Sequence, residues 1–335
     1  MGEIDPKEVR LFSGRSNRKL AEKIANCIEV PLEKTKVSRF SNDNLFVQLG
    51  ASVRGRKVYL VQSLTTPVSD HLVELLMMVD IAKSAAAREI HVIIPYFSYA
   101  RSDKKDAPRI SITARLIADL LKTAGATHFM AMTLHSPQVH GFFSIPADPL
   151  TARLEFIEYL KQRKLDPKES VVVSPDMGQA QPAARFAELL GLPVASAIKT
   201  RVSDTEVEIS GLIRRQVAGF KKAFIYDDEI ATAGTIINLS RILVESGVEE
   251  IVLICTHGLF LGKAVDRIRS IPEIREIITT DTVALPNEVK RQLPMLTILS
   301  VGHIFGKAII QNYIHRSIGE LFEHGEDSIE ETINV

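Results

Sequence analysis

The sequence reads Phe224-Ile-Tyr-Asp-Asp-Glu-Ile-Ala-Thr-Ala-Gly-Thr235 in the stretch that decides its fold. The apolar start predicts a buried strand that ends in two carboxylates, Asp227 and Asp228. The small residues that follow predict a loop that a ligand can approach closely, before a helix whose first N–H groups attract an anion. Two adjacent acids at a strand end need a hydroxyl or cationic partner. The stretch therefore predicts a site for a phosphorylated sugar, with an ordinary loop before a helix as the plain alternative.

Strand-length apolar runs alternate with segments of helical periodicity along most of the chain. Short buried strands that alternate with helices are typical of parallel sheets covered on both faces, so the expected fold class is α/β. The expected strands are 58–62, 91–95, 129–134, 171–174, 224–226 and 251–256, and the expected helices are 71–87, 112–123, 180–190 and 236–246.

The two halves of the sequence resemble each other, which predicts a duplicated α/β unit. The strand–loop–helix–strand pattern of residues 57–95 recurs in residues 222–256, and the helix at 114–121 echoes the helix at 184–190. We expect the last helix to pack back on the first domain. The expected domains are 1–150 and 151–335.

Composition excludes several classes of protein. The chain has 335 residues, with 41 Lys and Arg against 41 Asp and Glu, and this zero net charge argues against a dedicated nucleic-acid binder. Two distant cysteines, Cys27 and Cys255, exclude a disulfide scaffold and a cysteine-based zinc cluster, and we expect both thiols to be buried and free. The N-terminus is polar and acidic, and apolar runs stay far below the roughly 20 residues of a membrane span. We therefore expect a cytoplasmic protein that binds neither nucleic acid nor membrane.

Several motifs occur in the order of a known family over most of the chain. Residues 224–235 resemble the phosphoribosyl-diphosphate motif of type I phosphoribosyltransferase folds. The segment Leu11-Phe-Ser-Gly-Arg-Ser-Asn-Arg18 and residues 95–106 and 134–143 make the whole chain similar to the ribose-phosphate pyrophosphokinase (phosphoribosyl-diphosphate synthetase) family. The resemblance implies two tandem, duplicated type I phosphoribosyltransferase-like domains. It also implies Mg²⁺-dependent transfer of the β,γ-diphosphoryl group of ATP to the 1-hydroxyl of ribose 5-phosphate, which gives 5-phosphoribosyl 1-diphosphate and AMP.

The resemblance assigns the second half of the chain to the sugar phosphate and to catalysis. Lys199 and Arg201 open a polar stretch, 202–210, that predicts a mobile loop or a β-hairpin. By themselves these two cations read as surface charges, but the family pattern implies that both are catalytic. The implied ligands of ribose 5-phosphate are Arg201, Asp227, Asp228, Ala231, Thr232, Ala233, Gly234 and Thr235.

The first half carries most of the residues that the resemblance assigns to ATP. Residues 101–106 place three cations in a short segment that could hold a triphosphate, although a solvated charge run has the same composition. The family residue that matches His135 contacts Mg²⁺ or the ATP phosphates, and Asp176 matches a second Mg²⁺ position. The implied ATP ligands are Asn42, Asp43, Asn44, Arg101, Ser102, Lys104, Lys105 and His135, and the implied metal ligands are His135 and Asp176.

The resemblance also implies an assembly. In this family the loop that matches residues 42–44 recognises adenine and reaches the ATP site of a neighbouring subunit. We therefore expect a homo-oligomer built from dimers, up to a hexamer. The sequence leaves open whether ADP or phosphate acts as an effector.

Six positions depart from the residues that the family usually carries, and they leave two other interpretations open. One is a non-catalytic regulatory homologue in a mixed oligomer, although the retained Lys199 and Arg201 argue against a decayed site. The other is a phosphoribosyltransferase that consumes the diphosphate, although the duplicated first half has no place in a single-domain transferase. The departures are Asn42, Asn44, Ser102, Thr133, Gln179 and Ala231.

Overall fold

The computed structural model describes residues 4–197, 199–201, 207–209 and 211–322. This part of the chain forms two compact units, of which unit 1 contains residues up to Ala152 together with Thr282–Ala284 and the segment from Ser300 onward. Unit 2 contains Arg153–Asp281 and Leu285–Leu299. The expected boundary after residue 150 thus falls two residues early. The segment from Ser300 onward, whose helix was expected to pack back on the first domain, clusters with unit 1.

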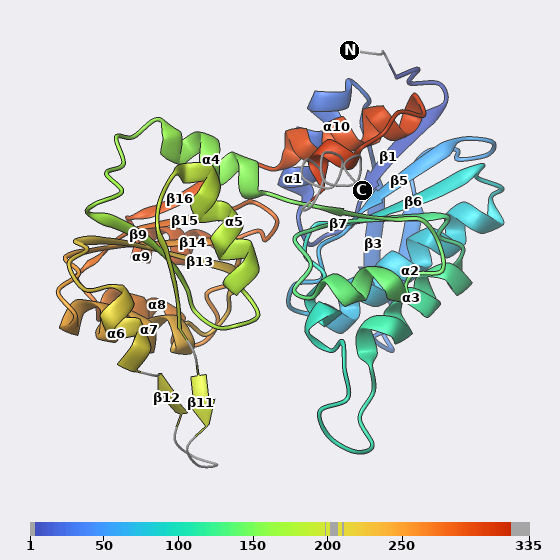
Figure 1. The fold of residues 1–335 in the computed structure, drawn as a ribbon. Coiled ribbons are helices and arrows are strands. Elements are labelled where there is room, and N and C mark those ends of the chain that lie inside the picture. Colours follow the sequence, from blue (N-terminus) through green and yellow to red (C-terminus); the bar gives the residue numbers. More distant parts are fainter. Residues whose placement is uncertain (1–3, 198, 202–206, 210, 323–335) are drawn as a thin grey trace, which may run out of the picture. The chain divides into compact units, whose positions relative to one another are not determined.

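Unit 1 is built on a parallel sheet with the strand order β2-β1-β5-β6-β7-β8 (Figure 1). The three strands β5, β6 and β7 are almost entirely buried, as expected for strands with helices on both faces. The strands are β1 (Val9–Ser13), β2 (Leu32–Glu33), β5 (Lys57–Val61), β6 (Glu89–Ile94), β7 (His128–Met132) and β8 (Ala147–Leu150).

Helices cover both faces of the unit 1 sheet, with α1 and α10 on one face and α2 and α3 on the other (Figure 1). Glycine permits the close approach of α10 to α1, because a Cβ atom at Gly306 would lie 2.4 Å from Sγ of Cys27. The helices are α1 (Arg18–Ile28), α2 (Val68–Ser84), α3 (Thr113–Ala124) and α10 (Gly302–Tyr313), with 3₁₀ turns η1 (Ser98–Arg101), η2 (Pro137–Phe142) and η3 (Gly319–Leu321).

Unit 2 contains a second parallel sheet with the strand order β10-β9-β13-β14-β15-β16. The side chain of Tyr226 in β13 stacks on Phe186 of α5 (Ala180–Leu190), with ring centroids 4.3 Å apart, and this packing anchors the strand just before its two acids. The strands are β9 (Ser170–Ser174), β10 (Val194–Ser196), β13 (Lys222–Ile230), β14 (Glu250–Gly258), β15 (Ile274–Thr280) and β16 (Leu296–Leu299).

The unit 2 sheet is also covered on both faces, by α4 and α5 on one and by α7 and α8 on the other (Figure 1). The helices are α4 (Arg153–Lys161), α5 (Ala180–Leu190), α6 (Gly211–Gln216), α7 (Gly234–Glu245), α8 (Ala264–Arg269) and α9 (Asn287–Gln292).

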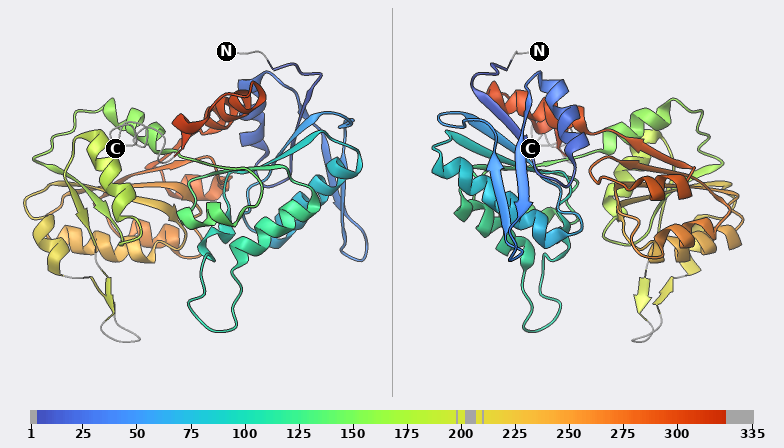
Figure 2. Two further views of the ribbon diagram at one scale, coloured as in Figure 1. Left: turned by 45° about the vertical axis from the view of Figure 1, so that its right-hand side comes forward. Right: turned by 180° about the vertical axis from the view of Figure 1, so that it is seen from behind.

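The two units share one topology, which supports the predicted duplication. In each sheet the first strand of the unit lies between the second and the third, and each later strand follows in order. Each unit also inserts an antiparallel hairpin between its second and third sheet strands. The hairpin of unit 1 runs along one side of that unit in the left view of Figure 2. The hairpin strands are β3 (Thr35–Arg39) and β4 (Leu45–Leu49) in unit 1, and β11 (Lys199–Arg201) and β12 (Val207–Ile209) in unit 2.

The expected elements need three corrections. The echo between residues 114–121 and 184–190 is misleading, because α3 follows the fourth sheet strand of its unit and α5 follows the first of its own. The strand expected at 224–226 continues to Ile230, since its last residues pair with β14. Cys27 is half-buried, whereas Cys255 is fully buried as expected.

Among the described residues, no helix combines the length and apolarity that a membrane crossing requires.

Candidate functional site

The order of strands identifies where a ligand can bind in unit 2. The strand order reverses between the adjacent parallel strands β9 and β13, because β10 follows on one side of β9 and β13 on the other. In open parallel sheets, ligands bind beyond the carboxyl ends of the strands at such a point. Asp176 follows β9 by two residues, and Asp227 and Asp228 lie near the end of β13. The topology therefore brings the predicted metal ligand Asp176 and the predicted acidic pair to one edge of the sheet.

Asp227 interacts with both of the other acids. Asp228 is buried, and its backbone N–H donates to Oδ1 of Asp227 over 2.9 Å. Burial raises the pKa of Asp227 well above its usual range, and the neighbouring charges of Asp228 and Asp176 raise it further. Oδ1 of Asp176 accepts a hydrogen bond from the backbone N–H of Gln179 over 3.1 Å. A divalent cation or sugar hydroxyls at this edge would favour the ionised form of Asp227.

The loop of residues 231–235 lies directly beyond the acidic pair. Helix α7 begins at Gly234, and its N-cap residue Ala233 adopts the left-handed conformation with φ 60° and ψ 8°. The first N–H groups of a helix of this length are a natural anion site. All five predicted phosphate-loop residues are therefore positioned at the start of one helix, next to the carboxylates that would bind a diol.

Unit 1 fills the equivalent point of its own sheet, between β1 and β5, with its own side chains. A Cβ atom at Gly14 would lie 2.4 Å from the side chain of Gln62, whose Oε1 accepts from the backbone N–H and the hydroxyl of Ser16. Arg15 donates from its backbone N–H and from Nε to the fully buried carboxylate of Glu74, each over 2.8 Å. Unit 1 therefore shares the topology of unit 2 but holds a polar network of its own side chains between β1 and β5.

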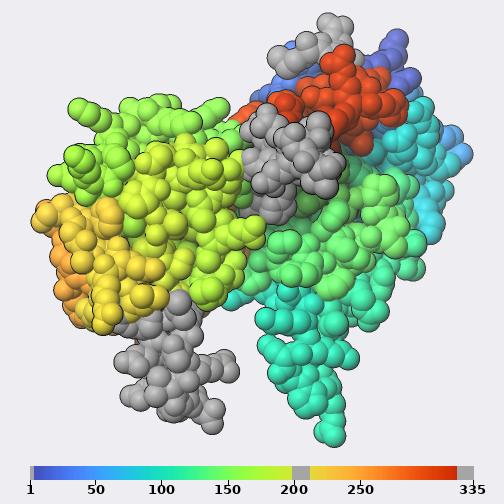
Figure 3. Space-filling view, in the orientation of Figure 1, coloured from blue at the N-terminus to red at the C-terminus, as the bar shows by residue number. Residues whose placement is uncertain are grey.

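The predicted ATP segment, residues 101–106, belongs to a loop that ends at residue 112 and stands out from the surface of unit 1, as the protruding teal segment of Figure 3 shows. Lys104 and Lys105 are exposed on it. The predicted ligand Ser102 has its hydroxyl engaged with the backbone, because Oγ accepts from the N–H of Thr113 over 3.2 Å and donates to the carbonyl of Ser111 over 3.3 Å. Ser102 thus closes the base of the loop.

The predicted adenine loop is the turn of the β3–β4 hairpin. Asp43 adopts φ 67°, and the N–H groups of Phe40 and Asp43 donate across the turn to Asn44 and Phe40. Oδ1 of Asn42 accepts from the N–H of Asn44 over 3.3 Å, so this side chain helps to build the turn. Arg39 forms ion pairs with Asp43 and with Asp70 of α2. The three predicted ligands therefore lie together on a turn that hydrogen bonds and the ion pairs of Arg39 stabilise.

The remaining predicted residues are only partly described. His135 is exposed shortly after β7, and the nearby Thr133 is buried with φ 40° while its N–H donates to the carbonyl of Leu150 over 2.7 Å. His135 belongs to unit 1 and Asp176 to unit 2. The backbone of Lys199 and Arg201 pairs with β12 in the predicted hairpin. Their side chains, and residues 202–206 and 210, lie outside the described part of the chain.

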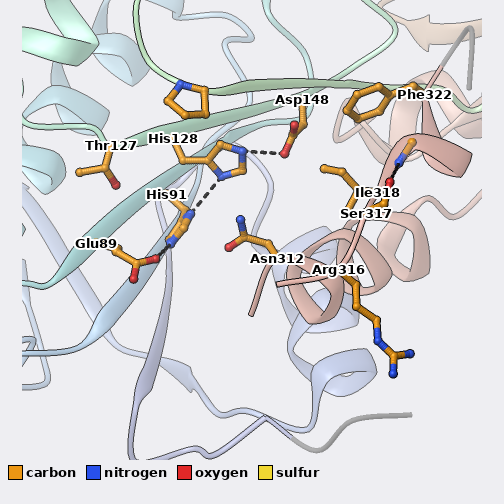
Figure 4. A pocket seen from close by; sticks show the side chains of 12 residues that line it. Glu89, His91, Thr127, His128, Asp148, Asn312, Arg316, Ser317, Ile318 and Phe322 are labelled. Carbon is orange, nitrogen blue, oxygen red and sulfur yellow. Dashed lines mark hydrogen bonds and ion pairs between the residues drawn. The ribbon is translucent and has the colours of Figure 1, made fainter. Parts of the chain in front are cut away.

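Sequence reasoning missed a polar cavity of about 550 Å³ in unit 1 (Figure 4). His91 and His128 face each other with their Nδ1 atoms 3.0 Å apart, and they are flanked by Glu89 at 3.1 Å and Asp148 at 2.6 Å. Burial lowers the pKa of His91 to about 3, and the charge of His128 adds to this effect. The sequence signal for this cavity was the spacing of Glu89 and His91. They lie two residues apart in a buried strand, so both side chains are on one face of the sheet.

The two sheets and the acidic strand end before a small-residue loop define the chain as a pair of type I phosphoribosyltransferase-like domains. Residues 9–125 match the N-terminal domain of ribose phosphate pyrophosphokinase, and residues 212–323 match the phosphoribosyl synthetase-associated domain. The chain belongs to the ribose-phosphate pyrophosphokinase family, as its sequence motifs suggest.

Individual relatives match over nearly their whole length. A putative ribose-phosphate pyrophosphokinase from Streptomyces coelicolor is 48% identical over 95% of this chain and 98% of its own. The ribose-phosphate pyrophosphokinase of Deinococcus radiodurans is 42% identical over 93% and 97%. The crystal structure of phosphoribosylpyrophosphate synthetase from Mycobacterium smegmatis has a TM-score of 0.85 and 34% identity, and it covers 92% of this chain and 99% of its own. The expected fold class is confirmed.

Proposed function

We propose that this chain is a ribose-phosphate diphosphokinase that transfers the β,γ-diphosphoryl group of ATP to ribose 5-phosphate. The anomeric hydroxyl attacks the β-phosphorus of ATP and loses its proton. A bond forms between that oxygen and the β-phosphorus, and the bond from the β-phosphorus to the oxygen that AMP retains breaks. The observation that carries the proposal is that Asp176, Asp227, Asp228 and the loop of small residues before α7 lie at the carboxyl edge of the unit 2 sheet.

The sugar phosphate would be held by unit 2. Residues 231–235 would bind the 5-phosphate through N–H groups and through the hydroxyls of Thr232 and Thr235. Asp227 and Asp228 would accept from the 2- and 3-hydroxyls of the ribose. Lys199 and Arg201 would neutralise charge on the transferring group, so that positioning and electrostatics account for most of the rate.

ATP and Mg²⁺ would be held by residues from both halves of the chain. Burial and the neighbouring charges of Asp228 and Asp176 raise the pKa of Asp227, and a divalent cation next to Asp176 would favour the ionised form of this carboxyl. Asp176 in unit 2 and His135 in unit 1 are each a proposed ligand of Mg²⁺, which neutralises phosphate charge when bound. Arg101, Lys104 and Lys105 would contact the phosphates, and Asn42, Asp43 and Asn44 the base. We infer a homo-oligomer, in which the turn of residues 42–44 contacts the ATP that is bound by a neighbouring subunit.

Release of AMP tests the proposal directly. Purified protein with Mg²⁺, ATP and ribose 5-phosphate should form AMP, and omission of the sugar should abolish it. Tight nucleotide binding without AMP would favour the regulatory homologue instead. Consumption of 5-phosphoribosyl 1-diphosphate with a nucleobase would favour a phosphoribosyltransferase.

Replacement of Ser102 with alanine should raise the KM for ATP by about threefold to tenfold, because one or two hydrogen bonds at the base of the loop are lost. The KM for ribose 5-phosphate should stay within twofold of its original value. Steady-state kinetics with each substrate varied in turn measure both constants. Ser102→Thr, which retains the hydroxyl, is the matched control, and an unchanged KM for ATP in Ser102→Ala would show that this closure has no functional role.

A further inference from the structure

The segment 259–267 donates hydrogen bonds to the carbonyls of residues 230–232, at the start of the phosphate loop (residues 231–235) of unit 2. The carbonyl of Ile230 accepts from the N–H groups of Leu259 and Phe260 over 2.9 and 3.1 Å. The carbonyl of Ala231 accepts from the N–H of Leu261 over 2.8 Å. The next carbonyl, that of Thr232, accepts over 2.8 Å from Nη1 of Arg267. Three successive carbonyls are therefore tied to one neighbouring segment.

This anchoring decides which way the loop presents its donors. In a trans peptide the carbonyl and the following N–H point in opposite directions. The N–H groups of Ala231, Thr232 and Ala233 must therefore point away from the segment 259–267. Successive N–H groups on one side of a turn form a concave anion-binding site. The segment thus prepares the loop to receive a phosphate before any ligand arrives.

The third anchor differs from the other two because it is a side chain. The peptide between Thr232 and Ala233 precedes an alanine in the left-handed conformation, which is unfavourable for a residue that carries a Cβ atom and which a rotation of this peptide could relieve. Arg267 of α8 holds this peptide, and its Nη1 lies 3.8 Å from where a Cβ atom of Gly234 would be. Its positive charge is therefore close to the start of α7.

We propose that Arg267 is a positioning residue for the sugar phosphate: it fixes the Thr232–Ala233 peptide so that its N–H faces the 5-phosphate. This inference rests on the proposed function of residues 231–235. Arg267 acts through the backbone and contributes nothing to ATP binding. Loss of Arg267 should therefore weaken the binding of the sugar phosphate but not the binding of ATP.

The test compares Arg267→Met with Arg267→Lys. Loss of a charge-assisted hydrogen bond should raise the KM for ribose 5-phosphate about tenfold in Arg267→Met, while the KM for ATP stays within twofold. Arg267→Lys retains a charged donor and should recover part of the loss. Arg269→Met changes an exposed arginine on the same helix and is the matched control.

Calorimetric titration with ribose 5-phosphate alone separates this inference from the proposed activity. If the original protein binds the sugar phosphate but forms no AMP, a tenfold weaker Kd in Arg267→Met still supports the positioning role. A Kd and a KM for ribose 5-phosphate within twofold of the original values would overturn it, and so would equal losses for both substrates. If Arg267→Met does not fold, Arg267→Lys decides: only part of the effect is expected to be recovered, so a weaker Kd for ribose 5-phosphate in that variant supports the positioning role, and an unaltered Kd overturns it.

Discussion

Replacement of Lys199 with alanine should lower the turnover number by about a hundredfold to a thousandfold, the usual effect of removing a group that stabilises transition-state charge. Phosphoryl transfer asks the protein for little covalent chemistry, so an ammonium close to the transferring group accounts for much of the barrier reduction. The backbone of Lys199 is paired with Ile209 in the β11–β12 hairpin. Such pairing does not depend on the side chain, so the fold should survive.

Steady-state assays of AMP release measure this effect, and the melting temperature of the variant reports on the fold. Lys164→Ala, which removes an exposed lysine from a loop of unit 2, is the matched control and should keep its turnover within twofold. A turnover near the original value in Lys199→Ala would remove this residue from the mechanism. A fall in turnover that accompanies a large fall in melting temperature would point to a structural role instead.

The sequence predicted the fold well where burial and periodicity act together. Helix α5 was predicted at its observed bounds, 180–190, and the repeat between residues 57–95 and 222–256 corresponds to equivalent elements of the two units. The end of β13 was predicted too early, because Asp227 and Asp228 look like loop residues. The ladder with β14 outweighs that local preference, since each backbone group gains a partner.

The candidate site was predictable as a set of residues but not as an arrangement. Proximity of Asp176 to Asp227 depends on β9 and β13 being neighbours, which only strand order reveals. The filled crevice of unit 1 was hidden because it depends on Gln62 lying over Gly14, far away in the sequence. The contact between Arg267 and Thr232 spans 35 residues and follows no motif.

The acidic edge of unit 2 predicts a conflict between stability and activity. The pKa of Asp227 is raised by burial and by its acidic neighbours, so folding favours the protonated form of this group. The unfolded chain ionises it at its ordinary pKa of about 4. The free energy of unfolding should therefore fall as the pH rises from about 4 through the raised pKa. A ligand cation or diol would offset this cost.

Asp227→Asn should remove this pH-dependent penalty and at the same time impair catalysis. In metal-free buffer at neutral pH, we expect the melting temperature to rise by about 2–4 °C for each kcal/mol recovered, with no gain below about pH 4. The kcat/KM for ribose 5-phosphate should fall about tenfold to a hundredfold, since a charged acceptor for a sugar hydroxyl is lost.

Melting curves between pH 4 and 8 in the presence of a chelator, together with kinetics at saturating Mg²⁺, check both parts of this prediction. Asp166→Asn is the control, because this exposed aspartate accepts from the N–H of Lys168 in a turn that asparagine can maintain. Parallel melting curves for Asp227→Asn and the original protein would contradict the electrostatic argument. An unaltered kcat/KM for ribose 5-phosphate would instead remove Asp227 from the ribose site. If the Asp227 carboxylate binds a sugar hydroxyl, removal of its charge must weaken the binding of the sugar.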